Sequence, residues 1–407
     1  MIGYPKALAL VINHVRAVPV ESVSINRALG RILAGDVVAP FPIPPFSSSA
    51  ADGYAVRARD VVRATEAHPV TLRLDAAVHA GDSAPARLKP LQAFRIFTGA
   101  PVSPGVDAVV MQERVQSAGG FVTLVSPVRE GENIRRRGAE FRKGRTVLRR
   151  GTPVTPPGIG LLATLGCRRV RVHCKPRVAI VVTGNELQWE AKALTGGAIY
   201  DSNSPALAAS LEALGVPPVL MLRARDSAPE IKAALVRALG AADVVISSGG
   251  VSVGDRDFVR DVCRSIGIRQ VFWRVAIKPG KPNFFGTKGK KLLFGVPGNP
   301  VAALLSFHLL IRPALFKMMG TTIAPALLLT ARMEVRVTKK AGRAEFLRAT
   351  LRTDEHGELL ARPVRGRDSH MLGGLAAADC LVHFSERASE LRAGQKVAVT
   401  LLRWSQG

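Results

Sequence analysis

Glycine-rich loops that adjoin apolar runs constrain most strongly what this chain can fold into. The run at 244–248 leads at once into Gly249 and Gly250, and two further such loops occupy residues 276–282 and 295–300. Glycine lets backbone amides approach a phosphate with no Cβ in the way, and successive amides form an anion-binding concavity. Residues 242–300 are therefore expected to hold an anion-binding crevice. A tight strand-to-helix turn, which would need the same glycine pair, is the alternative.

Between residues 178 and 315 the pattern alternates between strands and helices. The apolar run at 178–182 is continuous, as expected of a strand buried on both faces of a parallel sheet. Further strands are predicted at 219–222, 244–247 and 291–294, and helices at 202–214, 226–239, 257–266 and 299–315. This alternation predicts a Rossmann-like three-layer α/β/α domain with a parallel sheet. Ligands of such sheets bind at the carboxyl ends of the strands.

Strand patterns dominate on both sides of that domain. Short apolar runs separated by turns fill residues 70–128, and a second set of runs begins at residue 326. We therefore predict a multidomain α/β protein that has a mainly β insertion and a small C-terminal β domain.

The chain is strongly basic, with 57 Lys and Arg against 31 Asp and Glu and a net charge of +26. Such a charge suggests a polyanionic partner or an enzyme with a phosphorylated substrate. We favour the enzyme over nucleic-acid binding, because no basic motif is interleaved with aromatic residues. No apolar run reaches the about 18 residues of a membrane span. None of the four cysteines has zinc-site spacing, so a cytoplasmic protein with reduced, buried cysteines is expected.

Acidic residues follow the predicted strands and offer a metal site. Glu186, Asp226, Asp255 and Asp257 would gather at one edge of the sheet. Their oxygens suit a Mg²⁺ ion that also bridges a phosphate. Helix capping is the alternative for Asp226 and Asp257, which stand at predicted helix starts.

Positive charge is also expected near this edge, from Arg274, Lys278 and Lys281. Prolines restrict the loop that carries the two lysines, so an ammonium there is a good partner for an oxyanion. Plain surface charge is the alternative for Lys281. Far upstream, Asp52 and Thr98 stand in turns, where each is either a turn residue or a site residue.

Seven motifs together resemble the molybdopterin molybdenumtransferase family, which includes the MoeA-type enzymes and the E domain of gephyrin. The most distinctive are Ser-Gly-Gly-Val-Ser-Val-Gly-Asp at 248–255 and Val-Pro-Gly-Asn-Pro at 296–300. The motifs are specific only as a set, and they span nearly the whole chain. They lie at residues 44–55, 97–100, 131–135, 199–203, 247–255, 276–282 and 296–300.

The resemblance implies an enzyme that takes adenylylated molybdopterin and molybdate, requires Mg²⁺ or a similar ion, and releases AMP. It also implies an elongated homodimer of four subdomains with a β-barrel-like C-terminal domain. Transient contact with the adenylyltransferase or with molybdoenzyme chaperones is expected as well. The subdomains are expected at 23–40 with 140–173 (linker and dimerisation), 41–139 (β insertion), 5–22 with 174–320 (molybdopterin binding) and 325–407 (C-terminal β domain).

Motif matching also implies roles for single residues. Catalytic roles fall on Asp52, Asp226, Asp257 and Lys278, with Asp52 supplied by the partner subunit, and a metal site on Glu186, Asp226 and Asp257. For substrate binding the resemblance implies Thr98, Arg274, Pro297, Pro300 and Ser369, and the chemistry of the loops adds Gly249, Gly250, Ser252 and Lys281.

The chain departs from the family pattern at three places. Asn185 stands where an Asp is common, and Arg274 stands where a Lys can occur. The third departure is at Ser47, Ser48 and Ala51, which replace other residues before the Asp-Gly-Tyr triplet. Asn185 matters most, because it removes a negative charge beside the expected metal.

Two further hypotheses stay open. One is a molybdopterin adenylyltransferase, whose domain is similar to residues 174–320 and which would not need the flanking β domains. The other is a non-catalytic scaffold like the E domain of gephyrin, against which the acidic set of Asp52, Asp226 and Asp257 argues.

Overall fold

The computed structural model describes residues 1–188, 193–250, 258–321, 328–366 and 368–402. Two compact units make up the chain. The first comprises Met1–Gly35, Arg150–Ile159 and Arg168–Gly407, and the second comprises Asp36–Arg149 and Gly160–Cys167. Helix α2 (Pro156–Thr164) contributes residues to both units.

A six-stranded sheet lies at the centre of the first unit, in the order β16-β13-β17-β21-β20-β18. The strands are β13 (Val178–Thr183), β16 (Leu220–Ala224), β17 (Val244–Ser248), β18 (Arg269–Trp273), β20 (Phe284–Lys288) and β21 (Lys291–Val296). The first four in the sheet order run parallel, whereas β20 pairs antiparallel with both β21 and β18. The four strands predicted from the sequence are the four that run parallel, so that prediction is confirmed. Strands β18 and β20 were not predicted, and a tight hairpin joins β20 to β21.

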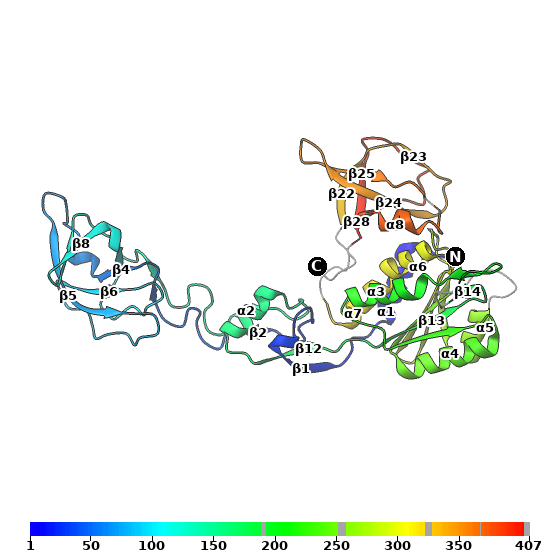
Figure 1. The fold of residues 1–407 in the computed structure, drawn as a ribbon, viewed down its shortest axis with the longest axis horizontal. Coiled ribbons are helices and arrows are strands. Elements are labelled where there is room, and N and C mark those ends of the chain that lie inside the picture. Colours follow the sequence, from blue (N-terminus) through cyan, green and yellow to red (C-terminus); the bar gives the residue numbers. More distant parts are fainter. Residues whose placement is uncertain (189–192, 251–257, 322–327, 367, 403–407) are drawn as a thin grey trace. The chain divides into compact units, whose positions relative to one another are not determined.

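Helices cover both faces of the sheet, as predicted. They are α1 (Tyr4–His14), α3 (Asn203–Ala213), α4 (Ala228–Ala241), α5 (Phe258–Ser265), α6 (Pro300–Ser306) and α7 (Arg312–Met318). Figure 1 shows α4 and α5 on one face and α3, α6 and α7 on the other. Ile180 of β13 packs toward α1 and α3, whereas its neighbour Val181 packs toward α4 and α5. Both faces of β13 are buried, which explains its continuous apolar run.

The helix predicted at 299–315 is built as α6, a π-helical turn η4 (Phe307–Ile311) and α7. Pro300–Met318 is long and apolar enough to cross a membrane, but 89% of the window is buried in the core. His308 lies in the π-helical turn and is buried. Burial, followed by the charge of Arg312, lowers the pKa of His308 to about 4, so its imidazole is neutral at pH 7.

The C-terminal part of the first unit is a closed five-stranded β-barrel. Its strands are β22 (Leu328–Met333), β24 (Ala344–Thr353), β25 (Leu359–Pro363), β26 (Cys380–Phe384) and β28 (Lys396–Leu401). They pair in the order β24-β25-β22-β28-β26, and β26 pairs with β24 to close the ring. Closure leaves no free barrel edge. Strand β19 (Ile277–Lys278) adds to β24 and joins the barrel to the α/β domain.

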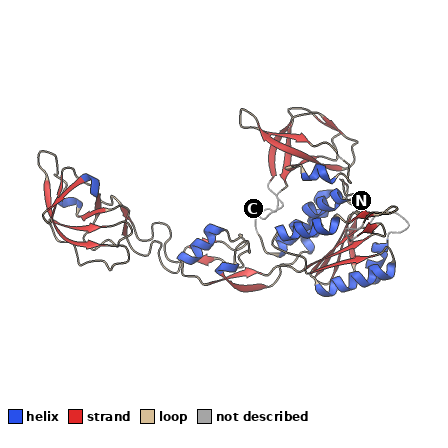
Figure 2. Ribbon diagram, viewed as in Figure 1, coloured by secondary structure: helices blue, strands red, loops and turns tan. Residues whose placement is uncertain are grey.

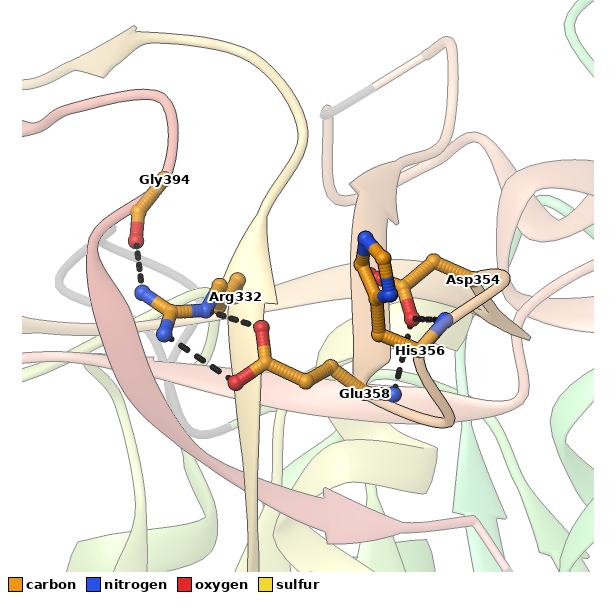
Figure 3. Close-up of polar contacts among 5 residues, drawn as sticks. All are labelled: Arg332, Asp354, His356, Glu358 and Gly394. Atoms are coloured by element: carbon orange, nitrogen blue, oxygen red, sulfur yellow. Dashed lines mark hydrogen bonds and ion pairs between the residues drawn. The ribbon is translucent and has the colours of Figure 1, made fainter.

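Polar contacts tie two turns of this barrel to β22 (Figure 3). The Arg332 guanidinium donates to both oxygens of Glu358 and to the carbonyl of Gly394. In the turn between β24 and β25, Asp354 Oδ1 accepts the N–H groups of His356 and Glu358 at 2.9 and 2.8 Å. The N–H of Glu358, and then that of His356, holds the pKa of Asp354 below its usual range.

The remaining elements of the first unit are short. Strands β1 (Val20–Ser24) and β12 (Arg169–His173) form an antiparallel pair. Besides these, the structure contains β14 (Leu187–Gln188), β15 (Ile199–Tyr200), β23 (Val337–Thr338), β27 (Glu390–Leu391), η1 (Ile25–Arg27) and α8 (Leu372–Ala376).

The second unit is mainly β, as predicted, and its helical content is limited to short turns and the end of α2 (Figure 2). Its sheet has the order β7-β4-β6-β5-β9-β8, in which only β5 and β6 pair in parallel. These strands are β4 (Gly53–Val56), β5 (Val70–Val78), β6 (Gln92–Ile96), β7 (Ala108–Met111), β8 (Val115–Ala118) and β9 (Phe121–Leu124). Shorter elements are β2 (Val37–Val38), β3 (Ser48–Ser49), β10 (Ile134–Arg135), β11 (Thr146–Leu148), η2 (Ala58–Asp60) and η3 (Gln112–Arg114).

All four cysteines are free thiols, but only two of them are buried. Burial raises the pKa of both Cys263 and Cys380 to about 12, so each stays a protonated, unreactive thiol at neutral pH. Cys167 and Cys174 are half-buried, so the expectation of buried cysteines holds for one pair only.

Candidate functional site

A cavity of about 590 Å³ opens at the carboxyl ends of β13, β17 and β21. This is where a doubly wound sheet is expected to bind its ligand. The predicted site residues that line it are Glu186, Asp226, Gly249, Gly250, Pro297 and Pro300. Residues far apart in the sequence thus meet at one edge of the sheet, as the strand pattern indicated.

The glycine pair after β17 is required by the close approach of β13. The φ angle of Gly249 is +90° and that of Gly250 is +62°. A Cβ at Gly249 would lie 2.4 Å from the carbonyl oxygen of Thr183 and 2.8 Å from its hydroxyl. Gly298 adjoins the pair, since a Cβ there would lie 3.8 Å from the Gly249 Cα. The predicted residues Ser252, Asp255 and Asp257 lie outside the described residues.

Asp226 is held in place by Asn185 through two reciprocal hydrogen bonds. The N–H of Asn185 donates to Asp226 Oδ2 at 3.1 Å, and the N–H of Asp226 donates to Asn185 Oδ1 at 3.0 Å. Asp226 does not cap helix α4; Ser227 does so, accepting the N–H of Glu230 at 3.4 Å. The capping alternative for Asp226 is therefore wrong. Its carboxylate instead bonds to the loop of Asn185 and Glu186. Both this loop and the loop of Asp226 reach the cavity.

Two lining residues, Asp201 and Asn203, were absent from the predicted site. The Asn203 amide donates to Ser248 Oγ at 2.9 Å and to the Gly298 carbonyl at 2.7 Å, so it links α3 to the neighbouring loops. Asp201 Oδ1 accepts the N–H groups of Asn203 and Ser204, both at 3.0 Å, and thereby caps α3. In the sequence, only the Asp-Ser-Asn triplet at 201–203, part of one motif of the family resemblance, pointed to these residues.

The three predicted cations do not line the cavity. The guanidinium of Arg274 lies 4.0 Å from the ring centroid of Trp273, on a backbone with φ +70°. Lys278 Nζ lies 3.4 Å from Glu345 Oε2, a carboxylate only 4% exposed that needs a positive partner. Lys281 is exposed, although its neighbour Pro282 does line the cavity.

Ser369 lies beside the cavity at the start of α6. Its hydroxyl accepts a hydrogen bond from the Asn299 amide at 2.7 Å, and its carbonyl accepts the N–H of Val301 at 3.2 Å. The next residue, His370, is itself a lining residue. The barrel therefore contributes the loop around Ser369 to the edge of the cavity.

In the second unit the predicted residues Asp52 and Thr98 meet. Asp52 Oδ1 accepts both the N–H and the hydroxyl of Thr98, each at 2.7 Å. The N–H, and then the hydroxyl, of Thr98 holds the pKa of Asp52 below its usual range, and Arg95 acts in the same direction. Asp52 is exposed and carries its negative charge at neutral pH. Two turns 46 residues apart in the chain are thus joined into one surface site.

The cavity presents two carboxylates that could contribute to holding a divalent cation. Glu186 and Asp226 both line it, and Mg²⁺ in proteins typically has one or two carboxylate ligands with phosphate oxygens and water completing the shell. Among the described residues no three His, Cys, Asp or Glu side chains gather closely enough to hold a metal alone. These two carboxylates therefore fit an ion that is shared with a bound phosphate.

Replacing Asn185 tests the clamp on Asp226. Asn185→Ala removes the acceptor for the Asp226 N–H and leaves the backbone N–H of Asn185 as the remaining one of the two hydrogen bonds, so the carboxylate is held less firmly, and we expect Mg²⁺ affinity to fall by about 10-fold. Titration calorimetry with Mg²⁺, repeated with Mn²⁺, measures this. Asn185→Asp keeps the acceptor and adds a negative charge, so it should bind the ions at least as tightly as the wild type. Unchanged affinity in Asn185→Ala would mean that the clamp has no part in cation binding.

Comparison with known proteins covers both units. The family model "MoeA N-terminal region (domain I and II)" matches residues 2–166, "Probable molybdopterin binding domain" matches 179–317, and "MoeA C-terminal region (domain IV)" matches 330–402.

Similar full-length proteins are also known. The molybdopterin molybdenumtransferase of Haemophilus influenzae is 35% identical over 384 residues, which is 93% of each chain. That of Bacillus subtilis is 34% identical over 391 residues, covering 95% of this chain and 91% of the relative. The crystal structure of the molybdopterin biosynthesis MoeA protein from Pyrococcus horikoshii superposes with a TM-score of 0.86 at 32% identity, covering 98% of this chain and all of that one. With family models and full-length relatives in agreement, the chain belongs to the MoeA family of molybdopterin molybdenumtransferases.

Proposed function

We propose that the protein is a molybdopterin molybdenumtransferase, which inserts molybdate into adenylylated molybdopterin and releases AMP. One observation carries the proposal most: the cavity at the strand ends combines a glycine loop with the carboxylates of Glu186 and Asp226, within the region matched by the molybdopterin-binding family model. An anion cradle next to cation ligands is the arrangement that phosphoanhydride cleavage needs.

In this mechanism the crevice binds the phosphoanhydride of the substrate. The absence of side chains at Gly249 and Gly250 lets the substrate approach the backbone, and Asn185 keeps the carboxylate of Asp226 oriented. Glu186 and Asp226, together with Asp257, would hold Mg²⁺, which when bound neutralises charge on the phosphates. A water oxygen attacks one of the two phosphorus atoms while the bond from that phosphorus to the bridging oxygen breaks, and AMP leaves with its own phosphate. The two dithiolene thiols replace two oxygen atoms of molybdate, which leave as water.

The other site residues keep proposed roles. Asp52 and Lys278 are proposed to act in catalysis together with Asp226 and Asp257. The carboxylate of Asp52 is charged, and the two hydrogen bonds from Thr98 orient it. Substrate contacts are proposed for Thr98, Gly249, Gly250, Ser252, Arg274, Lys281, Pro297, Pro300 and Ser369. For Lys278 the proposal requires that its ammonium serve an anion while it also compensates Glu345.

We also propose that the protein works in the cytoplasm as a homodimer of chains with four subdomains, divided as the resemblance implies. Each subunit supplies Asp52 and Thr98 to a site of its partner. The resemblance supports this, as does the presence of acidic site residues in both units: Asp52 in the second, Glu186 and Asp226 in the first.

The proposed function is tested by following the pterin product. Purified protein is incubated with adenylylated molybdopterin and Mg²⁺, with or without molybdate, and the product is used to reconstitute a molybdenum-free molybdoenzyme. We expect reconstitution only when both molybdate and the protein are present. Equal reconstitution without the protein would contradict the proposal.

A further inference from the structure

The cavity at the strand ends carries an imbalance of charge. Three carboxylates line it, those of Glu186, Asp201 and Asp226, and no lysine or arginine is among the described residues around it. His370 is the one described lining residue that has a basic side chain. Because like charges repel strongly where water is excluded, a phosphate in this cavity needs a compensating group. His370 is therefore the lining side chain best suited to face an anion.

The barrel holds the loop that carries His370. Arg348 of β24 is only 3% exposed, and its guanidinium donates to three carbonyl groups of this loop. The acceptors are Gly366 at 2.7 Å, Met371 at 2.9 Å and Asp368 at 3.2 Å. A buried guanidinium needs such acceptors, so the backbone on both sides of His370 is kept in place.

The α/β domain also binds this loop. The hydroxyl of Ser369, the residue before His370, accepts the amide of Asn299 at 2.7 Å, and its carbonyl accepts the N–H of Val301 at 3.2 Å. The carbonyl of His370 itself accepts the N–H of Leu372 at 3.0 Å. A side chain on a backbone that is anchored in this way loses little conformational freedom when it binds a ligand.

The arrangement of the cavity does not suit His370 to a role as a metal ligand. To complete an ion site with Glu186 and Asp226, its imidazole would have to lie close to both carboxylates. Among the described residues no three His, Cys, Asp or Glu side chains are arranged to hold a metal. The imidazole is therefore better placed to serve an anion directly.

We propose that His370 is a substrate-binding residue, whose imidazole donates an N–H to a phosphate oxygen of the adenylylated substrate in this cavity. The proposal rests on the proposed function, which supplies the phosphoanhydride. An imidazole donates a hydrogen bond in either protonation state and adds a positive charge when it is protonated. Gly249 and Gly250 offer backbone to the phosphates from the sheet, and His370 approaches them from the barrel loop.

Equilibrium binding of AMP to the full-length protein in Mg²⁺ tests this. His370→Leu removes both ring nitrogens and should raise the Kd for AMP by about 10-fold, as expected when a hydrogen bond to a charged group is lost. His370→Gln keeps an N–H donor and should recover most of the affinity. His356→Leu is the matched control, at a histidine 79% exposed in a turn of the same barrel, and should leave the Kd unchanged.

Adenosine, which lacks the phosphate, and Mg²⁺ alone separate a phosphate contact from a general loss of binding. The Kd for each should be the same in His370→Leu and in the wild type. The proposal is overturned if His370→Leu binds AMP normally, if it loses AMP and adenosine equally, or if it loses affinity for Mg²⁺ alone. A wild type that does not bind AMP would overturn it as well.

Molybdate-dependent AMP release by the wild type judges the proposed function separately. If the wild type releases AMP and His370→Leu keeps its full affinity for AMP, the proposed function stands and only the role of His370 is lost.

Discussion

Asp226→Asn is expected to lower the kcat of molybdate-dependent AMP release by about 100-fold, the scale on which loss of a single stabilising group acts in other active sites. The substitution removes a negative charge from the cavity and keeps the shape of the side chain. Its amide oxygen can still accept the N–H of Asn185, which now donates to Asp226 Oδ2 at 3.1 Å. The two loops should therefore stay joined, and the loss of activity would report on charge and not on folding.

Steady-state AMP assays across a range of Mg²⁺ concentrations measure the effect. Part of the activity should return at high Mg²⁺ if Asp226 holds the ion. The matched control is Glu212→Gln, which removes one exposed carboxylate from α3 in the same unit and should keep wild-type kinetics. A kcat within about threefold of the wild type for Asp226→Asn would remove Asp226 from the catalytic set.

Gly53→Ala should have the largest effect on stability. A Cβ at Gly53 would lie 1.8 Å from the carbonyl oxygen of Val110 and 2.8 Å from its carbonyl carbon. Gly53 belongs to β4, which pairs with both β6 and β7, so neither neighbour can retreat without breaking a ladder. We expect the free energy of unfolding of the second unit to fall by about 3 kcal/mol or more. The same shift would displace Asp52 from Thr98.

Differential scanning calorimetry and limited proteolysis between residues 36 and 149 check this expectation. Gly240→Ala is the control, because Gly240 lies on the exposed side of α4 with nothing within 4 Å of an added Cβ. Alanine there should stabilise the first unit by about 0.5–1 kcal/mol, since glycine is a poor helix former. Equal stability of Gly53→Ala and the wild type would mean that β4 has room that the structure does not show.

The core of the α/β domain could be predicted because a continuous apolar run in the sequence reflects a strand that is buried on both faces. A strand covered by helices on both faces is expected to be a nearly continuous apolar run, and such runs, at 178–182 and 244–246, mark β13 and β17 in the sequence. The antiparallel strands β20 and β18 were not predicted, because their apolar runs are less continuous. Gly286 interrupts β20, and β18 begins with the polar pair Arg269 and Gln270.

The site was only partly predictable, because the missing information lies in contacts between distant residues. The predicted strand ends were enough to identify Glu186 and Asp226 as site residues. The sequence around Asn203, in contrast, gives no indication that its side chain bonds to Ser248 and Gly298, which are 45 and 95 positions away. The ion pair of Lys278 with Glu345 spans 67 residues and links the α/β domain to the barrel. Such pairings depend on which domains pack together, and local periodicity carries no information about that.

The most direct measurement for the central claim is AMP release from adenylylated molybdopterin by the purified protein, with Mg²⁺ present and with molybdate either added or omitted. The account predicts stoichiometric release of AMP that depends on molybdate, on Mg²⁺ and on Asp226, with molybdenum recovered on the pterin. Release that is equally fast without molybdate, or formation of adenylylated molybdopterin from molybdopterin and ATP as the main activity, would contradict it.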